Sequence, residues 1–98
     1  MNTNSAGKLN RILRGIVTAL VDDVQNIDIG TITEEDRITL RVEVSPNDAG
    51  KVIGKMGRTA RSIRTIMSAI AMKEMCHVNI DIVDSDSDTG VRRPNEDA

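Results

Sequence analysis

The sequence contains no phenylalanine, tyrosine or tryptophan among its 98 residues. A hydrophobic core must therefore be built from isoleucine, valine, leucine, methionine and alanine side chains. The same absence argues against RNA-recognition-motif and OB-fold readers, because those domains stack bases on aromatic rings. Any recognition of nucleic acid by this chain has to depend on other side chains and on the backbone.

Cysteine is almost absent too, and long apolar runs are missing. The single cysteine, Cys76, excludes an internal disulfide framework and suits a reducing compartment. No apolar run approaches the roughly 20 residues that a membrane span needs. Residues 1–7 lack the basic-then-apolar order of a signal peptide. These absences predict a cytoplasmic protein without a membrane segment, and the length predicts a single folded domain.

The net charge of −2 hides an uneven distribution of charge. Residues 84–98 carry five acidic side chains against two arginines, a net charge of −3. Residues 1–83 carry eleven basic and ten acidic side chains, a net charge of +1. A run of 14 residues has no acidic side chain and contains five basic ones: Lys51, Lys55, Arg58, Arg61 and Arg64. Such a basic stripe attracts phosphate even when the whole chain is slightly acidic.

The spacing of apolar residues predicts the helices and strands. Apolar residues recur every three or four positions from Leu9 to Val24, which predicts a helix over 5–24. Alternation predicts strands at 27–29 and 38–44, with a turn at 34–36 between them. A short helix over 49–53, a longer helix over 58–75 and a last strand around 78–82 follow. The inner face of the longer helix is expected to consist of Ala60, Ile63, Ile66, Met67, Ile70 and Ala71.

The resulting order, α-β-β-α-α-β, predicts a compact α+β fold with three helices packed on a three-stranded sheet. We expect residues 1–7 to form a flexible N-terminus, 8–83 the folded domain and 84–98 a disordered acidic tail. The tail composition cannot bury enough apolar surface to offset the entropy lost on ordering. The residues expected in the core are Leu13, Ile16, Leu20, Leu40, Val42, Ile53, Ile63, Ile66, Ile70 and Ile80.

The segment Gly54-Lys55-Met56-Gly57 separates the short helix from the longer one. Glycine lacks a Cβ, so each glycine can adopt positive φ and let another backbone come close. The first N–H groups of the longer helix have no partner inside the helix and form a partial positive charge suited to phosphate. The spacing therefore indicates a phosphate clamp, although a plain helix-loop-helix turn has the same two glycines.

The run Val52-Ile53-Gly54-Lys55-Met56-Gly57, followed by Ile63, resembles the signature of KH domains. The element order resembles the type II, prokaryotic arrangement. The longer run from Pro46 to Thr65 is similar to the small bacterial KhpA/YlqC-like KH proteins, and the resemblance covers roughly residues 8–83. Two positions depart from the pattern: Ala60 stands where many KH domains carry isoleucine, and Met56 where polar or basic residues are common.

The resemblance implies a cytoplasmic RNA-binding protein without catalytic activity or a cofactor, acting as a chaperone-like or post-transcriptional regulatory factor. It also implies that the chain forms homodimers or pairs with a Jag-type KH protein. KH loops hold about four nucleotides of single-stranded RNA by their backbone. The predicted RNA-binding residues are Lys51, Gly54, Lys55, Met56, Gly57, Arg58, Arg61 and Arg64.

Other residues suggest alternatives. Thr65, Ala69 and Met72 project from the longer helix away from its core stripe, so they predict a protein interface. This interface leaves a KH-fold interaction scaffold with weak or no RNA binding as the alternative function.

Cys76 and His77 would point to opposite faces if both lie in the last strand, so we expect them to be structural. One histidine and one cysteine are too few for a metal site. The acidic tail either keeps the protein soluble, which we favour, or competes with RNA for the basic stripe.

Overall fold

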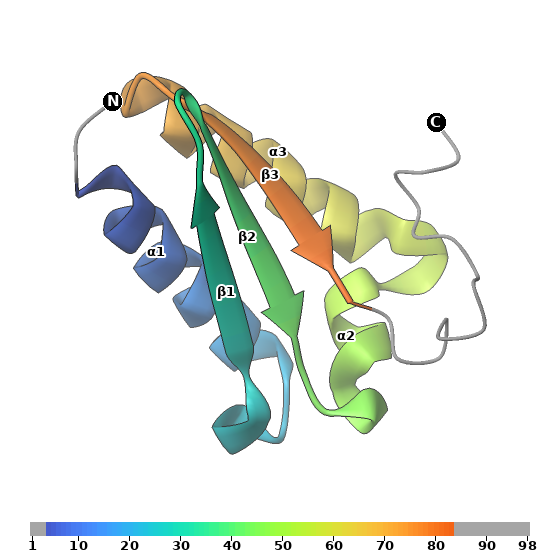
Figure 1. Cartoon of the computed structure of the whole chain (residues 1–98). Helices are drawn as coiled ribbons and strands as arrows, with labels where there is room; N and C mark the ends of the chain where they lie inside the picture. The colour runs from blue at the N-terminus through green and yellow to red at the C-terminus, as the bar shows by residue number, and fades with distance from the viewer. Residues whose placement is uncertain (1–3, 84–98) are drawn as a thin grey trace.

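The computed structural model describes residues 4–83 of the chain. The helices and strands follow one another in the predicted order (Figure 1): α1 Ser5–Leu20, β1 Asp28–Thr33, β2 Arg37–Glu43, α2 Ala49–Ile53, α3 Arg58–Lys73 and β3 His77–Ile82. Short 3₁₀ turns lie at Val24–Asn26, Pro46–Asp48 and Lys55–Gly57. The predicted α+β fold of three helices and three strands is therefore confirmed, including the order that the resemblance to type II KH domains implies.

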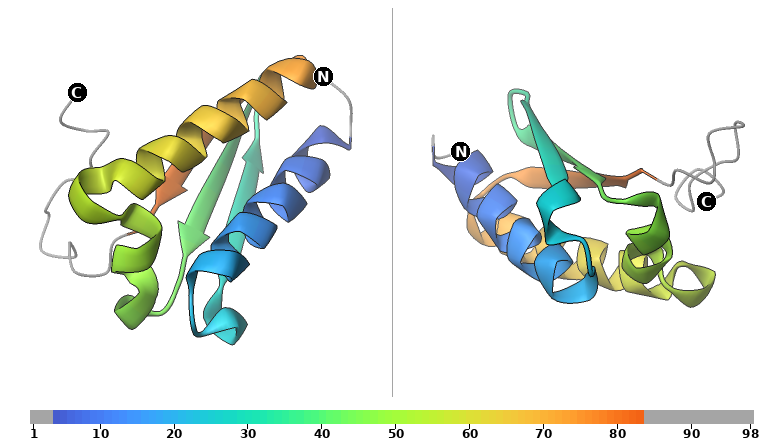
Figure 2. Two further views of the ribbon diagram at one scale, coloured as in Figure 1. Left: turned by 180° about the vertical axis from the view of Figure 1, so that it is seen from behind. Right: turned by 90° about the horizontal axis from the view of Figure 1, so that it is seen from below.

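The three strands form one mixed sheet with β2 in the centre. β1 and β2 form an antiparallel hairpin in which Thr33 lies opposite Ile38. β3 pairs with β2 in parallel, so that Arg37 lies opposite His77. Because a parallel pair needs a crossover connection, α2 and α3 carry the chain from β2 back to the start of β3. The helices cover one face of the sheet (Figure 2), and none of the helices within residues 4–83 lies on the opposite face.

The core lies between the sheet and the two long helices. Spacings of four residues place Leu9, Leu13 and Val17 on one face of α1, and all three are fully buried. Alternation in β2 points Ile38, Leu40 and Val42 toward the same side. The buried residues of α3 are Ala60, Ile63, Met67 and Ala71. Full burial of one such leucine, isoleucine or valine contributes about 1.5–3 kcal/mol relative to leaving it exposed.

The predicted first helix extends too far. α1 ends at Leu20, Val21 is extended and buried, and Val24 is 48% exposed. The apolar spacing continues to Val24, but the backbone N–H groups of Asp22 and Asp23 donate hydrogen bonds to the carboxylate of Asp48, which belongs to a later segment of the chain. Those two N–H groups cannot also continue the helical ladder, so the helix stops.

Ile66 is the one predicted core residue that the structure leaves exposed. Its side chain is 52% exposed, because its neighbour Met67 occupies the position on α3 that faces the core. Four other predicted core residues are only half-buried, although they pack against the core: Ile16, Leu20, Ile53 and Ile70. Leu13, Leu40, Val42, Ile63 and Ile80 are buried as predicted.

α1 begins at Ser5, where the apolar spacing predicts that the first helix begins. Ser5 is 1% exposed, and its Oγ donates at 3.2 Å to Oε1 of Glu74, the residue that directly follows α3. Lys8 Nζ contacts the other oxygen of the same carboxylate at 2.7 Å. Residues 5–7 therefore lie within α1, although the predicted division of the chain assigned them to the flexible N-terminus. The predicted acidic tail lies outside the described residues. Over residues 4–83, none of the helices combines the length and the hydropathy that crossing a membrane requires.

Candidate functional site

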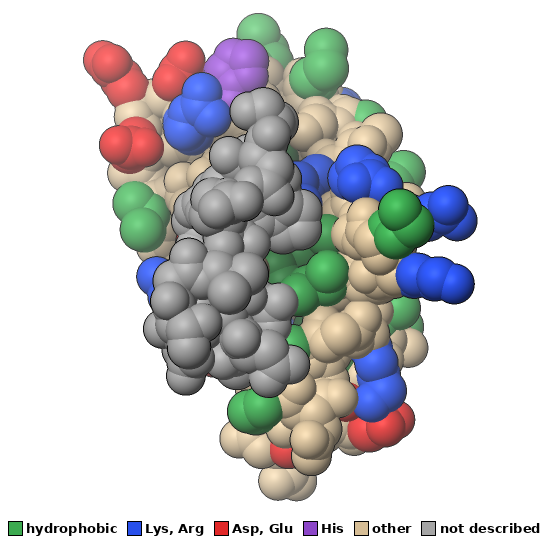
Figure 3. All heavy atoms as spheres, turned by 90° about the vertical axis from the view of Figure 1, so that its right-hand side faces the viewer, with side chains coloured by type: hydrophobic (Ala, Val, Ile, Leu, Met, Phe, Trp, Pro, Cys, Tyr) green, Lys and Arg blue, Asp and Glu red, His purple; other side chains and the backbone are tan. Residues whose placement is uncertain are grey.

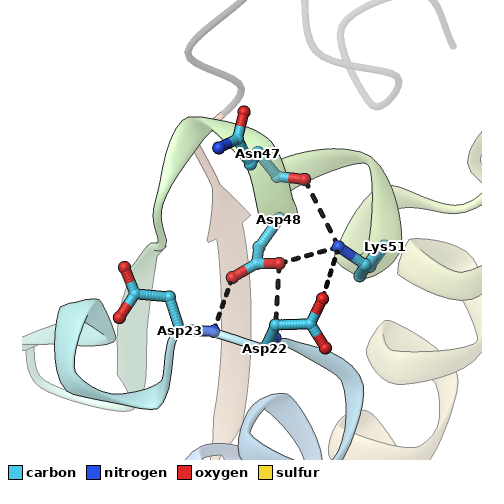
Figure 4. Close-up of polar contacts among 5 residues, drawn as sticks. All are labelled: Asp22, Asp23, Asn47, Asp48 and Lys51. Carbon is cyan, nitrogen blue, oxygen red and sulfur yellow. Dashed lines mark hydrogen bonds and ion pairs between the residues drawn. The ribbon is translucent and has the colours of Figure 1, made fainter.

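The short helix α2 is fixed in place by a buried carboxylate at its start. Asp48 is 2% exposed and accepts hydrogen bonds from the backbone N–H groups of Asp22, at 3.3 Å, and Asp23, at 2.9 Å. Lys51 Nζ donates to the same carboxylate at 2.9 Å and lies 3.2 Å from Asp22 Oδ2 (Figure 4). This cluster joins the end of α1 to the first turn of α2.

The same contacts shift the pKa values of Asp48 and Lys51. The Lys51 ammonium, followed by the Asp23 N–H group, holds the pKa of Asp48 below its ordinary value of 3.8, although burial opposes this shift. The hydrogen bonds to Asp48 and then to Asp22 raise the pKa of Lys51 above 10.5. Both side chains are therefore charged at neutral pH, and they neutralise each other.

Both glycines of the loop adopt positive φ. Gly54 has φ 80° and ψ 165°, and Gly57 has φ 75° and ψ 14°. A Cβ at Gly54 would lie 2.6 Å from Thr59 Cβ and 2.7 Å from the Thr59 backbone nitrogen, which is far closer than real Cβ atoms come. Gly54 is therefore required both by its backbone conformation and by the close approach of α3.

The two residues between the glycines lie on the surface. Lys55 is exposed, and Met56 is 74% exposed with a φ of 58°. The Gly57 N–H donates to Gly54 O at 3.0 Å, which closes the loop into one tight turn. α3 then begins at Arg58, so the first N–H groups of a 16-residue helix face this turn. The exposed cations and the N-terminus of α3 together give the protruding loop a positive electrostatic potential.

The five basic residues of the predicted stripe have different surroundings. Lys55, Arg58 and Arg61 are exposed, and no carboxylate of residues 4–83 lies within ion-pair distance of them. Lys51 is already paired with two carboxylates. Arg64 is half-buried, and its Nε donates to Ile80 O of β3 at 3.2 Å. The structure therefore brings three of the five together as exposed cations, while Lys51 and Arg64 also hold elements of the fold.

A shallow surface depression of about 580 Å³ continues from these cations along α3. Its lining combines the two arginines with small and apolar side chains: Arg58, Arg61, Ser62, Thr65 and Ile66. Lys and Arg side chains gather along the right-hand edge of Figure 3, on the side of the molecule where the helices lie. Positive charge is thus concentrated beside the loop although the chain as a whole carries −2.

The part of the chain that resembles known proteins includes α2, the loop and α3. A model of the KhpA/KhpB KH domain matches residues 10–82, which include α2, the loop and α3. The chain belongs to the KhpA/KhpB KH-domain family. The RNA-binding protein KhpA of Clostridium acetobutylicum is 40% identical over 75 residues, which are 76% of this chain and 100% of the relative. The proteins of that name from Bacillus subtilis and Streptomyces coelicolor are 40% identical over 76 residues (78% and 94% of the two chains) and 37% identical over 78 residues (80% and 95%).

The predicted interface residues of this KH domain are all on the surface. Thr65, Ala69 and Met72 lie along the outer side of α3, and Met72 is 73% exposed. Thr65 Oγ1 donates to Arg61 O at 3.0 Å, so this hydroxyl is turned back onto its own helix. The misassigned Ile66 adds another apolar side chain beside them. The exposed side of α3 is therefore less polar than that of an ordinary surface helix.

Cys76 and His77 differ from the prediction in one respect. The strand begins at His77, so strand alternation does not apply to Cys76, which precedes it. Cys76 is 5% exposed and burial raises the pKa of its thiol, whereas His77 is exposed. Both nevertheless line one depression at the end of α3. Within residues 4–83, no three His, Cys, Asp or Glu side chains are grouped closely enough to bind a metal.

Two residues that position the loop were missed in the sequence. No role was predicted for Asp48 or for Thr59. The spacing of Asp48 and Lys51, three residues apart around a helix start, was a visible signal for their ion pair. Nothing in the sequence indicates that Thr59 packs against Gly54, because this contact depends on the angle between α2 and α3.

Proposed function

We propose that this KH domain binds single-stranded RNA by its backbone, with the loop Gly54-Lys55-Met56-Gly57 as the clamp. The observation that carries the proposal is the loop itself: two glycines at positive φ hold Lys55 and Met56 in solvent at the start of α3. The relatives named RNA-binding protein KhpA support it. The protein then serves in the cytoplasm as a chaperone-like or post-transcriptional regulatory factor, without an enzymatic step.

The proposed contacts fall into two groups. Lys55, Arg58 and Arg61 neutralise phosphates, because they are exposed and have no carboxylate partner among residues 4–83. Gly54, Met56 and Gly57 let the RNA backbone approach the N–H groups at the start of α3. Lys51 and Arg64 contribute less to RNA binding. Lys51 would have to share its charge with Asp48 and Asp22, and Arg64 already donates to a backbone carbonyl of β3.

This division predicts the salt dependence of binding. For single strands, log affinity falls against log salt with a slope of about −0.7 for each neutralised phosphate. Three contacts give a slope of about −2, and five contacts, with Lys51 and Arg64 included, give about −3.5. Sequence preference should be slight, because one KH module reads only about four nucleotides.

The test replaces Lys55 and Met56 together by aspartate. The pair loses one cation and gains two anions beside the phosphate, so affinity for an unstructured RNA should fall at least about tenfold, or ~1.4 kcal/mol. The fold should survive, because both positions are exposed and aspartate tolerates the φ of 58° at position 56 better than methionine does.

A matched control separates the loop from overall charge. Replacing Arg11 and Thr18 by aspartate makes the same change in net charge at exposed positions of α1. This control should bind RNA nearly as tightly as the parent. A folded Lys55/Met56 double variant that also binds like the parent would remove the loop from the mechanism. The alternative function, a KH-fold interaction scaffold, would then take first place.

We also propose that Thr65, Ala69 and Met72 form a contact surface for protein. The exposed apolar character of this side of α3 supports a helix-to-helix contact. The partner is a second copy of this chain or a Jag-type KH protein, as the family resemblance implies. Because Arg58, Arg61 and Thr65 line the same depression, a protein bound there would lie directly beside the RNA.

A further inference from the structure

The corner of the loop carries a methionine in a conformation that side chains rarely adopt. Met56 has φ 58° and ψ 25°, which lie in the left-handed region. Glycine and asparagine enter this region at a lower free-energy cost and are the usual residues there. Met56 is 74% exposed, so packing within the domain compensates for little of the strain. The reason for a methionine at this corner therefore lies outside the fold of the free chain.

The binding of phosphate gives this side chain no task. In the run 54–58 the backbone N–H groups and the cations of Lys55 and Arg58 suit phosphate, whereas Met56 is the only apolar side chain. Cations neutralise the phosphates of single strands and of duplexes alike, so they do not distinguish the two forms of RNA. An exposed thioether instead packs against apolar or aromatic surface. In RNA such a surface is the face of a base.

The face of a base is accessible only where the strand is unpaired, because a duplex stacks its bases against one another. Many single-strand binders stack bases on aromatic rings, but this chain has no aromatic residue. Methionine can take the place of such a ring. Its polarizable sulfur packs favourably against ring systems at about 5 Å, and its three rotatable bonds let it adapt to bases of different shape.

We propose that Met56 is the residue with which the loop selects unpaired RNA. Its thioether packs against the face of one base, while Lys55 and Arg58 neutralise neighbouring phosphates. The inference rests on the proposed RNA binding by this loop, and it adds the contact that distinguishes a single strand from a duplex. Every base has such a face, so the contact is selective for strand form and tolerant of sequence.

The experiment measures the affinity of the full-length protein for an unstructured RNA and for a duplex of the same length, by fluorescence anisotropy at several salt concentrations. Met56→Asn and Met56→Gly remove the thioether without changing the charge. Both should weaken binding to the single strand roughly two- to tenfold, as loss of a contact between sulfur and a ring does. The ratio of single-strand to duplex affinity should fall by the same factor.

The salt dependence separates this contact from the cations. In Met56→Asn and Met56→Gly the slope of log affinity against log salt should stay that of the parent, because no phosphate contact is lost. In Lys55→Gln the slope should become shallower by about 0.7. Met56→Leu has nearly the same volume and remains apolar, so it should retain most of the affinity for the single strand.

Met75 provides the matched control. It is 82% exposed and has a φ of 62°, but it lies at the other end of α3, roughly 24 Å away along a helix of 16 residues. Its chain neighbours are Glu74 and Cys76, so no cation directly flanks it. Met75→Asn and Met56→Asn should both raise the melting temperature, because asparagine relieves the strain. Only Met56→Asn should weaken RNA binding.

Three results would overturn the inference while leaving RNA binding by the loop intact. One is a parent-like affinity for the single strand in both Met56→Asn and Met56→Gly. Another is an equal loss of affinity for single strand and duplex, which would mean that Met56 contacts the RNA backbone. The third is a lower melting temperature in Met56→Asn, which would mean that methionine stabilises the turn by itself. A parent protein that binds neither RNA would overturn the proposed function, and this inference with it.

Discussion

Replacing Gly54 by alanine tests whether the loop geometry depends on a missing side chain. At φ 80° and ψ 165° the backbone is in a region that only glycine enters readily, and a residue with a side chain pays about 1–3 kcal/mol there. The new Cβ would also lie 2.6 Å from Thr59 Cβ and 2.7 Å from the Thr59 backbone nitrogen. Overpacking of this kind typically costs another ~1–3 kcal/mol, and here part of it falls on backbone that cannot rotate away.

The two contributions together predict a loss of about 2–6 kcal/mol in the free energy of unfolding. For a domain of this size each kcal/mol lowers the melting temperature by roughly 4–8 °C, so the expected decrease is at least about 8 °C. Urea denaturation followed by circular dichroism measures both the midpoint and the slope. An unchanged slope would show that the loss is one of stability and not of compactness.

Two comparisons isolate the cause. Gly15→Ala changes an exposed glycine of α1 with open space around it, and it should stabilise the protein by about 0.8–1 kcal/mol through helix propensity. Combining Gly54→Ala with Thr59→Ala removes Thr59 Oγ1, which also lies against the position of the new Cβ, and should restore only part of the loss, because the Thr59 Cβ, the Thr59 nitrogen and the φ remain. If Gly54→Ala unfolds at the same urea concentration as the parent, the claim that α3 approaches this glycine closely is wrong.

Three further predictions concern the cluster at α2, the tail and the exposed side of α3. Asp48→Asn should lower stability at neutral pH, because the ion pair with Lys51 is lost. The pKa of Asp48 is lowered in the folded protein, so the stabilisation by its carboxylate is present above pH 3.8 and disappears as the pH falls through the folded pKa. The urea midpoints of the parent and the variant should therefore converge in acid. A difference between the midpoints that stays constant with pH would contradict the assignment. Deleting residues 84–98 should leave RNA affinity within about threefold at physiological salt, where exposed charges more than about 8 Å apart are largely screened. A gain of tenfold or more in filter binding would instead mean that the tail competes with RNA for the loop. Ala69→Arg should halve the apparent mass in sedimentation without changing the helical signal, and a parent chain that is already monomeric at high micromolar concentration would exclude the homodimer.

The sequence was sufficient for those elements whose ends are marked locally. Pro46 and Gly54 bracket α2, whose bounds 49–53 were predicted correctly. The strict alternation from Ile38 to Val42 likewise determined which face of β2 is buried. These features depend only on residues that are close together in the chain, so a pattern within a short window contains them.

Other features depend on contacts between distant segments, and the sequence could not supply them. Val21 and Val24 continue the apolar period of α1, but Asp48 binds the intervening N–H groups from 25 and 26 residues away. Ile66 and Met67 are neighbours on one helix, and only the orientation of α3 against the sheet decides which of them is buried. Lys55, Arg58 and Arg61 of the basic stripe are exposed in the structure, whereas Asp22 becomes a neighbour of Lys51 only in the folded chain.

The parallel pairing of β2 and β3 has a consequence for how the protein acquires its structure during synthesis. Arg37 pairs with His77, so the central strand gains its second neighbour only after 40 further residues have been made. Before that point the chain can form little more than α1 and a two-stranded hairpin, and an isolated hairpin is marginal in water. Closing so long a connection is entropically unfavourable until the last contacts are present. On the ribosome, the Gly54–Gly57 loop would therefore become ordered only when β3 has emerged, and incomplete nascent chains would not present a finished loop to RNA.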